Sequence, residues 1–148
     1  MAVTVQDPGN LGTLVRTAAA FGLGGLILTS DCADLCHPKT VRGSMGTVFD
    51  MPVVTVDDPA AAVRCLREQG YAVYGTALDR EAQPLDKLDL PDKTCFLLGN
   101  EGHGLPEELL SECSGKVFIP MTNRAESLNV SAAAAVVAYS VFTKRKNP

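Results

Sequence analysis

Polar side chains crowd the junction between an apolar strand-like segment and an apolar helix near the end of the chain. The stretch IPMTNRAESLNVSAAAAVV places five of them between the two: Asn123, Arg124, Glu126, Ser127 and Asn129. Polar groups beside buried elements cost free energy unless they are paired or put to use. These side chains therefore indicate either capping of the helix or a functional site.

Two further loops carry residue types that could serve chemistry, DPGNLGTLVR (7–16) and LLGNEGHGLP (97–106). In parallel α/β sheets the ligand lies beyond the carboxyl ends of the strands, where such loops emerge. Each loop is weak evidence by itself. Its glycines are equally explained as turn residues, Asn10 as a helix cap and Arg16 as a solvated helix residue.

Spacing argues against two common kinds of site. GNEGHG has its glycines at 99, 102 and 104, so it lacks the GxGxxG dinucleotide fingerprint and also the ending of a Walker A loop. The sequence has two histidines, His37 and His103, and no serine in a GxSxG elbow, which disfavours a serine hydrolase.

Strand-like and helix-like segments alternate along the chain. Apolar runs predict strands over 2–5, 25–29, 52–56, 71–78, 94–98 and 116–119. Apolar spacing predicts helices over 11–19, around 39–45, over 59–69, just after Pro106 and from about 127 to 144. We expect Asn10 to cap the first helix, Gly22 to end it, and a polar loop to run through Asp92. The strands lack alternating polarity, so we predict an α/β fold, a parallel sheet with helices on both faces, in a single domain over 1–148.

Composition narrows the class of protein. The 148 residues carry a formal net charge of −4, which lowers but does not remove the expectation of nucleic-acid binding. Five cysteines form no CxxC pair and no set spaced for zinc, so we expect reduced thiols, no metal and a cytoplasmic location. We expect no membrane segment, because the apolar runs fall short of the roughly 20 residues that a span needs.

Taken together, the three loops resemble the motifs of a known family. DPGNLGTLVRTAAAFG, GNEGHGL and IPMTNRAESLNVSAAAA are similar, in this order, to those of the SpoU (TrmH-type) branch of the SPOUT RNA ribose 2′-O-methyltransferases. The resemblance spans essentially the whole chain, and VRGSMGTVFDMPV resembles the family's segment between the first two motifs. One departure is Asn123, where the family usually has glycine; asparagine tolerates a left-handed backbone better than most residues.

The resemblance implies a fold and a set of ligands. Family members are parallel α/β domains whose C-terminal segment is threaded through a loop, which makes a deep trefoil knot. They bind S-adenosylmethionine in the knot, work as homodimers and methylate ribosomal or transfer RNA. Many relatives also carry an N-terminal RNA-binding domain, for which we expect no room before Asp7 in this chain.

The resemblance also assigns the residues that would hold the cofactor. Main-chain groups of Gly99, Ile119 and Leu128 would hold the adenosine part, with Thr76 and Met121 nearby. Glycine suits a position where the backbone approaches a ligand closely. The apolar side chains suit the faces of an adenine ring, and ordinary core packing would use them equally well.

Catalytic roles follow from the same three motifs. Arg16 and Asn10 match the first, Glu101 the second, and Ser127 and Asn129 the third. Methyl transfer to a ribose needs a fixed 2′-oxygen and help in removing its proton. Because a guanidinium pKa above about 12 makes proton abstraction costly, we expect Arg16 to orient phosphate and hydroxyl. The motif asparagines and Ser127 would hold Arg16 and the ribose in place, while Glu101 supports the loops.

The partners and the alternatives complete these expectations. An isolated monomer would struggle to cover the apolar final helix together with the helix over 11–19, which fits a homodimer. Basic residues are the expected RNA contacts, although a solvated tail explains the last three equally well: Lys39, Arg42, Arg124, Lys144, Arg145 and Lys146. Two alternatives stay open, a non-catalytic RNA-binding or dimerisation module on the same scaffold and a nicotinamide oxidoreductase, which the missing fingerprint disfavours.

Overall fold

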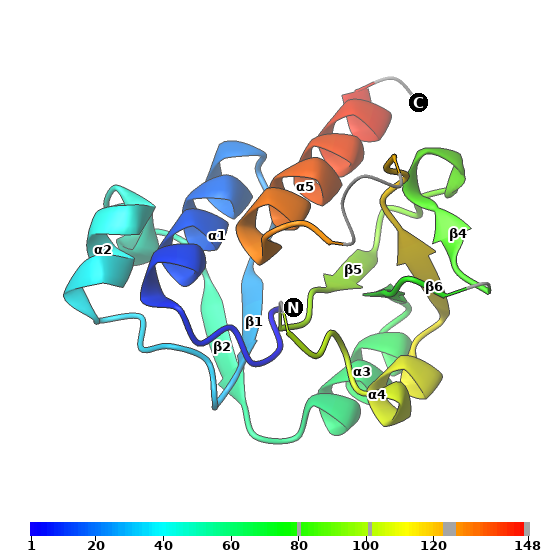
Figure 1. Cartoon of the computed structure of the whole chain (residues 1–148), viewed down its shortest axis with the longest axis horizontal. Helices are drawn as coiled ribbons and strands as arrows, with labels where there is room; N and C mark the ends of the chain where they lie inside the picture. Colours follow the sequence, from blue (N-terminus) through cyan, green and yellow to red (C-terminus); the bar gives the residue numbers. More distant parts are fainter. Residues whose placement is uncertain (80, 101, 123–126, 147–148) are drawn as a thin grey trace.

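A parallel sheet runs through the centre of the molecule (Figure 1). The computed structural model describes residues 1–79, 81–100, 102–122 and 127–146. Its strands pair in parallel in the orders β1-β2 and β4-β6-β3-β5. Their bounds are β1 Leu26–Thr29, β2 Val53–Val56, β3 Ala72–Thr76, β4 Gln83–Pro84, β5 Thr94–Leu97 and β6 Gly115–Phe118.

The first residues of the chain join these two ladders into one sheet. Ala2 forms parallel bridges with Leu28 in β1 and with Leu98 just beyond β5. The Ala2 N–H donates to the Ile27 carbonyl at 2.8 Å, and the Val3 N–H donates to the Leu98 carbonyl at 2.9 Å. The start of the chain therefore lies between β5 and β1 as an additional short parallel strand.

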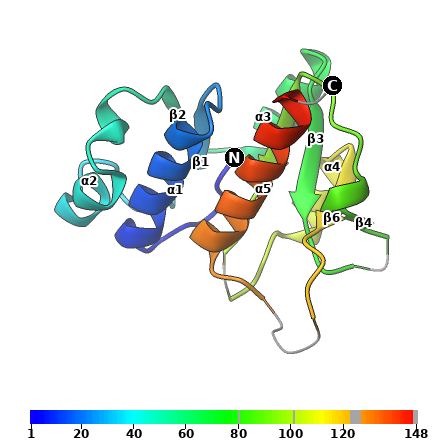
Figure 2. The same cartoon turned by 90° about the horizontal axis from the view of Figure 1, so that it is seen from above.

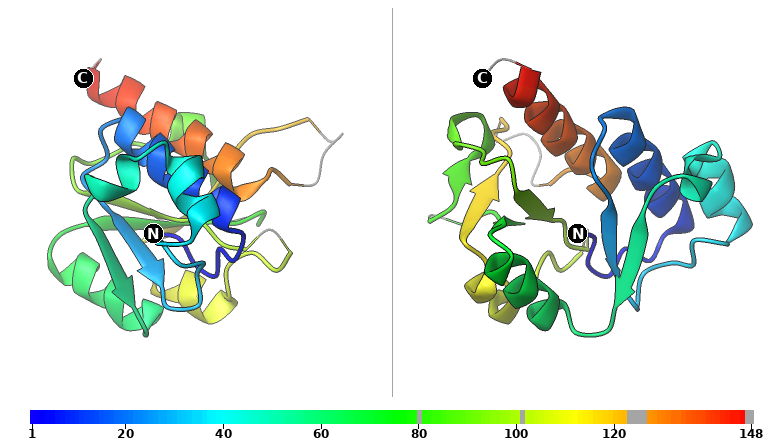
Figure 3. Two further views of the ribbon diagram at one scale, coloured as in Figure 1. Left: turned by 90° about the vertical axis from the view of Figure 1, so that its left-hand side faces the viewer. Right: turned by 180° about the vertical axis from the view of Figure 1, so that it is seen from behind.

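Helices cover both faces of the sheet, as Figures 2 and 3 show. Their bounds are α1 Pro8–Ala20, α2 Pro38–Ser44, α3 Pro59–Glu68, α4 Glu107–Glu112 and α5 Val130–Lys146, with 3-10 turns η1 Thr47–Phe49 and η2 Leu85–Lys87. Among the described residues, none of these helices has the length and apolarity to cross a membrane. The predicted parallel α/β fold is confirmed.

Successive residues of one strand pack on opposite faces. Leu26 and Leu28 lie in the core that α1 and α5 form on the sheet, whereas Ile27 packs into the core that α3 and α4 form on the other side. Both faces are thus buried. This burial is the reason that the strands show continuous apolar runs instead of alternating polarity.

The start of α1 differs from the prediction that Asn10 is its cap. The N-cap is Asp7, whose carboxylate accepts the Asn10 N–H at 2.8 Å, and Pro8 occupies the first turn. Proline has no N–H to satisfy there, and an aspartate before it is a strong cap, so the helix begins earlier than its apolar stripe. The predicted end is confirmed, since Gly22 follows the helix with a left-handed φ of 64°.

Two further boundaries differ from expectation. The segment expected to be a polar loop through Asp92 contains β4 and η2, and its Leu85 and Leu88 are buried against α5. The last helix begins at Val130, not at 127, because the Asn129 side chain accepts the Ser131 N–H at 2.9 Å and caps it.

Helices α1 and α2 approach closely through glycine. A Cβ built on Gly12 would lie 2.4 Å from the carbonyl oxygen of Thr40 and 3.0 Å from the Cα of Gly43. Neither atom belongs to a flexible side chain. The absence of a side chain on Gly12 therefore sets the spacing of these helices, and with it the place of the first motif.

We predict that Gly12→Ala destabilises the protein. The added methyl group forces α1 and α2 apart, and such overpacking costs about 1–3 kcal/mol, partly offset by the better helix propensity of alanine. Urea denaturation measures the change. Gly24→Ala is the control, because its Cβ would meet no atom within 4 Å. Equal stability of the two variants would show that α1 and α2 are not closely packed.

Candidate functional site

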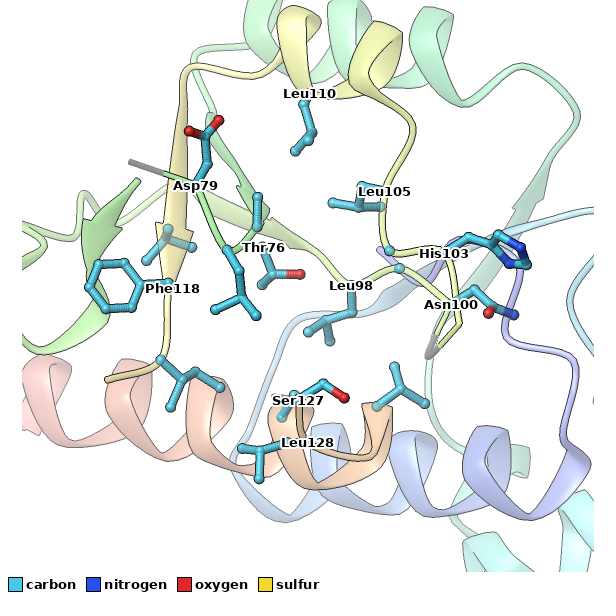
Figure 4. A pocket seen from close by; sticks show the side chains of 18 of the residues that line it. Thr76, Asp79, Leu98, Asn100, His103, Leu105, Leu110, Phe118, Ser127 and Leu128 are labelled. Atoms are coloured by element: carbon cyan, nitrogen blue, oxygen red, sulfur yellow. The ribbon is translucent and has the colours of Figure 1, made fainter. Parts of the chain in front are cut away.

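A cavity of about 470 Å³ opens at the carboxyl ends of β3, β5 and β6 (Figure 4). The segments that follow these three strands form its walls, and the start of α5 closes one side. A ligand bound in a parallel α/β sheet is expected at this edge. The size suits a small organic molecule rather than a single ion.

The five residues predicted to hold a cofactor all line this one cavity: Thr76, Gly99, Ile119, Met121 and Leu128. Ser127, one of the predicted catalytic residues, lines it as well. They come from positions as far apart as 76 and 128 in the sequence, on different loops. The structure therefore brings the second and third motifs together.

The loop after β5 is shaped by glycine and by Asn100. A Cβ on Gly99 would lie 2.4 Å from the carbonyl carbon of Gly104. The backbone at Gly99 and the backbone at Gly104 therefore lie too close together for a side chain at position 99. The Gly104 N–H donates to the Asn100 carbonyl at 2.8 Å, and the Gly102 N–H donates to the Asn100 side-chain oxygen at 2.7 Å. Glycine at 99 is thus required by the loop itself, in addition to any ligand.

Asn100 and the neighbouring His103 also line the cavity, although neither was predicted as a site residue. Their position within GNEGHG was the available signal. Thr76 has a structural role too, because its hydroxyl donates to the Leu97 carbonyl at 2.9 Å and ties the end of β3 to the end of β5.

An ion-pair cluster borders the cavity. The Lys116 ammonium lies 2.7 Å from a carboxylate oxygen of Asp79 and 2.9 Å from one of Glu107, and both acids line the cavity. The Asp79 hydrogen bond, followed by that of Glu107, raises the pKa of Lys116 far above its ordinary range. Among the described residues, this cluster holds two carboxylates for one ammonium group.

The first motif approaches the third through a pair of asparagines. The Asn129 amide donates to the Asn10 side-chain oxygen at 3.2 Å, across 119 residues of sequence. Arg16, further along α1, is exposed and is not among the residues that line the cavity. A single chain thus assembles Asn10, Asn129 and Ser127 near the cavity, but not Arg16.

Several predicted residues lie outside the described ones: Glu101, Asn123, Arg124 and Glu126. Two of the expected RNA contacts have structural partners, since Lys144 donates to the carbonyls of Leu85 and Leu88 and Arg145 to that of Asp92. Lys39 pairs with Asp7 at 2.8 Å. Contact of these residues with RNA stays a prediction.

No metal site is evident within 1–79, 81–100, 102–122 and 127–146, where no three His, Cys, Asp or Glu side chains gather suitably. The five cysteines are free thiols.

Comparison with known proteins identifies the family. The model of the SpoU rRNA Methylase family matches residues 1–139, which include all three loops. The chain belongs to the SpoU rRNA methylase family. Among curated relatives of this family, the chain is 42% identical over 135 residues to the 23S rRNA (guanosine(2553)-2′-O)-methyltransferase RlmP of Bacillus subtilis, covering 91% of this chain and 54% of that protein.

Solved structures of similar proteins share the fold. The SpoU methyltransferase AviRb from Streptomyces viridochromogenes, in complex with the cofactor AdoMet, superposes with a TM-score of 0.89 at 31% identity, covering 99% of this chain and 60% of that one. A chain solved in work on 2-OH methylation of C/U34 on tRNA has a TM-score of 0.87 at 29% identity, covering 99% and 95%. The chain spans about half the length of the curated relatives it matches.

We predict that Lys116→Met lowers the melting temperature, because it removes the ammonium group that lies 2.7 Å from the Asp79 carboxylate and 2.9 Å from that of Glu107. The folded-state pKa of Lys116 is raised, so its stabilising effect is fully present below the unfolded pKa of about 10.4 and disappears as the pH rises through the folded value.

Thermal melts from about pH 6 to about pH 11 test this dependence. We expect the melting temperatures of the wild type and Lys116→Met to differ by a constant amount up to about pH 10, and this difference to become smaller above that pH. Lys87→Met, which removes an exposed lysine of η2, is the control. A difference that grows above pH 10 would contradict the ion-pair assignment.

Proposed function

We propose that this chain is a catalytic domain that transfers a methyl group from S-adenosylmethionine to a ribose 2′-hydroxyl of ribosomal or transfer RNA. The observation that carries the proposal is the convergence of Thr76, Gly99, Ile119 and Leu128 on one cavity at the carboxyl edge of the sheet. Family membership and the AdoMet complex of the relative AviRb support the same ligand.

The cavity fits the parts of S-adenosylmethionine. Apolar Leu98, Ile119 and Leu128 offer faces for the adenine ring, and the backbone around Gly99 offers hydrogen-bonding groups at close range. The edge formed by Asp79, Glu107 and Lys116 suits a ligand that carries positive charge. Bound there, the cofactor would supply an electrophilic methyl group.

The polar residues of the third motif would act on the ribose. Ser127 lies at the cavity (Figure 4), and the Asn129–Asn10 hydrogen bond places the start of α1 beside it. Their role would be to fix the 2′-oxygen in line with the methyl group. Arg16 would orient the hydroxyl and an RNA phosphate, and Glu101 would support the loop.

A second copy of the chain would complete this site. The exposed surface of α1 and α5 carries Arg16, Val136 and Tyr139, and the Tyr139 ring, 57% exposed as a residue, packs edge-on against Phe21 with centroids 5.9 Å apart. Large exposed apolar side chains on α5, which packs beside α1, suit a two-fold interface. Arg16 would then reach the cavity of the partner subunit from α1.

The chain path supports the proposed trefoil knot. β6 lies on the far side of β3 from β5, yet Ser127 and Leu128 line the same cavity as Gly99 and Asn100, and α5 packs against α1. Threading of the C-terminal segment through the loop at 98–105 would place both at the same cavity. The proposal also includes RNA as the substrate and the cytoplasm as the place of action.

We predict that Gly99→Ala abolishes binding of S-adenosylmethionine measured by isothermal titration calorimetry. The new Cβ would collide with the backbone of Gly104 and displace the wall of the cavity. Gly102→Ala is the matched control in the same loop, because its Cβ would come no closer than 3.3 Å to the side-chain oxygen of Asn100. Wild-type affinity in Gly99→Ala would place the cofactor elsewhere.

We predict that Arg16→Ala binds S-adenosylmethionine with nearly unchanged affinity, because Arg16 does not line the cavity of its own chain. The variant should nevertheless lose methyl transfer to RNA, since Arg16 would orient the hydroxyl and an RNA phosphate. Transfer of a radioactive methyl group to RNA from cells that lack the protein measures the activity. Normal turnover in this variant would remove Arg16 from the mechanism.

Mixed dimers test whether Arg16 acts on the partner's cavity. Arg16→Ala and Ser127→Ala are each expected to be inactive alone. After equal mixing and subunit exchange, a symmetric dimer with shared sites should recover about a quarter of wild-type activity, because half of the dimers contain one intact site. No recovery, with exchange shown by mass spectrometry, would place Arg16 and Ser127 in the same subunit's site.

Binding of RNA without binding of cofactor would favour the non-catalytic module.

A further inference from the structure

The short segment at the start of the chain, which lies between β5 and β1, ends in an unusual backbone conformation. Thr4 has a φ of 56°, in the left-handed region. A β-branched residue rarely adopts this conformation, because its side chain crowds the backbone there. Such a residue stays in place only where surrounding contacts hold it.

Two neighbours at the end of β1 supply these contacts. The Thr4 N–H donates to the hydroxyl oxygen of Thr29 at 2.9 Å, and the Thr4 hydroxyl donates to one carboxylate oxygen of Asp31 at 2.8 Å. The other carboxylate oxygen of Asp31 accepts the hydroxyl of Thr29, whose residue is 5% exposed. Asp31 thus fixes both threonines, and these hydrogen bonds, that of Thr29 first, lower the pKa of its carboxyl.

The same residue touches the wall of the cavity. The Thr4 carbonyl accepts the side-chain amide of Asn100 at 3.1 Å, across 96 residues of sequence. That bond orients Asn100, whose side-chain oxygen in turn accepts the Gly102 N–H at 2.7 Å. Asn100 itself lines the cavity, where Figure 4 shows it beside His103.

We propose that Asp31 and Thr4 are positioning residues of the cavity, which hold Asn100, and through it Gly102, in the arrangement that receives the cofactor. This inference rests on the proposed function for the identity of the ligand. Two successive hydrogen bonds connect these residues: Asp31 accepts one from the Thr4 hydroxyl, and the Thr4 carbonyl accepts one from Asn100. Loss of the carboxylate would let Thr4 relax to an extended conformation and turn its carbonyl away from Asn100.

A double-mutant cycle tests the role of the strain. Asp31→Ala should weaken S-adenosylmethionine binding about 10-fold, the scale of one positioning hydrogen bond. Glycine adopts a positive φ without a side-chain clash, so Thr4→Gly removes the need for Asp31. We therefore expect Thr4→Gly and the double variant Asp31→Ala/Thr4→Gly to bind with affinities within about 3-fold of each other.

Asp57→Ala is the matched control, since Asp57 is an exposed aspartate that follows the neighbouring strand β2. It should bind like the wild type. An unchanged affinity in Asp31→Ala, or an equal loss in both backgrounds of the cycle, would overturn the inference. Failure of the wild type to bind S-adenosylmethionine would instead contradict the proposed function.

Hydrogen exchange tests the positioning role of Asp31 separately from the identity of the ligand, because it needs no ligand. Asp31→Ala should exchange the amide of Gly102 at least about 10-fold faster, since its acceptor on Asn100 is no longer fixed, and Thr4→Gly in the double variant should restore the slow rate. The amide of Val73, in the centre of the sheet, should keep its wild-type rate. Unchanged exchange at Gly102 would overturn the inference whether or not the cofactor binds.

Discussion

Parallel pairing of β5, β3 and β6 is the constraint on which the candidate site depends. Gly75 pairs with Leu97 of β5 and with Lys116 of β6, so the three strands end at the same edge of the sheet. The Thr76 hydroxyl adds a bond to the Leu97 carbonyl at this edge. The loops that follow have to emerge side by side, and the cavity is the space between them.

The polar groups around the cavity are fixed before any ligand arrives. Asn100 is bonded to the first strand and to its own loop, Asn129 to Asn10 and to the start of α5, and Lys116 to two carboxylates. A site held in this way loses little conformational entropy on binding. It can also keep reacting groups at a set distance, which methyl transfer requires. Within the polar junction before α5, Asn129 caps the helix and also donates a hydrogen bond to Asn10 of the first motif.

Much of the fold could be predicted from local sequence, and most of the site could not. Continuous apolar runs predicted β1, β2 and β5 to within about two residues. In β1 the reason is burial on both faces, which needs apolar side chains at successive positions, whereas β2 is partly exposed. The prediction that Asn10 caps α1 was wrong, because Pro8 occupies the first turn of the helix and Asp7 is therefore its cap. Leu85 and Leu88 were missed in a polar segment because their burial depends on α5, more than forty residues later.

The site residues came from the resemblance of three motifs, and their convergence on one cavity depends on contacts between distant segments. Asn10 meets Asn129 across 119 residues and Thr4 meets Asn100 across 96, and no spacing rule predicts either contact. The strain at Thr4 was equally hidden, because nothing in AVTVQ marks a left-handed residue.

The most direct test of the account is a titration of the ¹⁵N-labelled protein with S-adenosylmethionine, followed by the amide signals in NMR. We expect saturable shifts that are largest at Gly99, Ile119 and Leu128, while the signals of Gly24 and Gly25, at the opposite end of the sheet, stay unchanged. Shifts centred on Gly24 and Gly25, or none at millimolar cofactor, would contradict it.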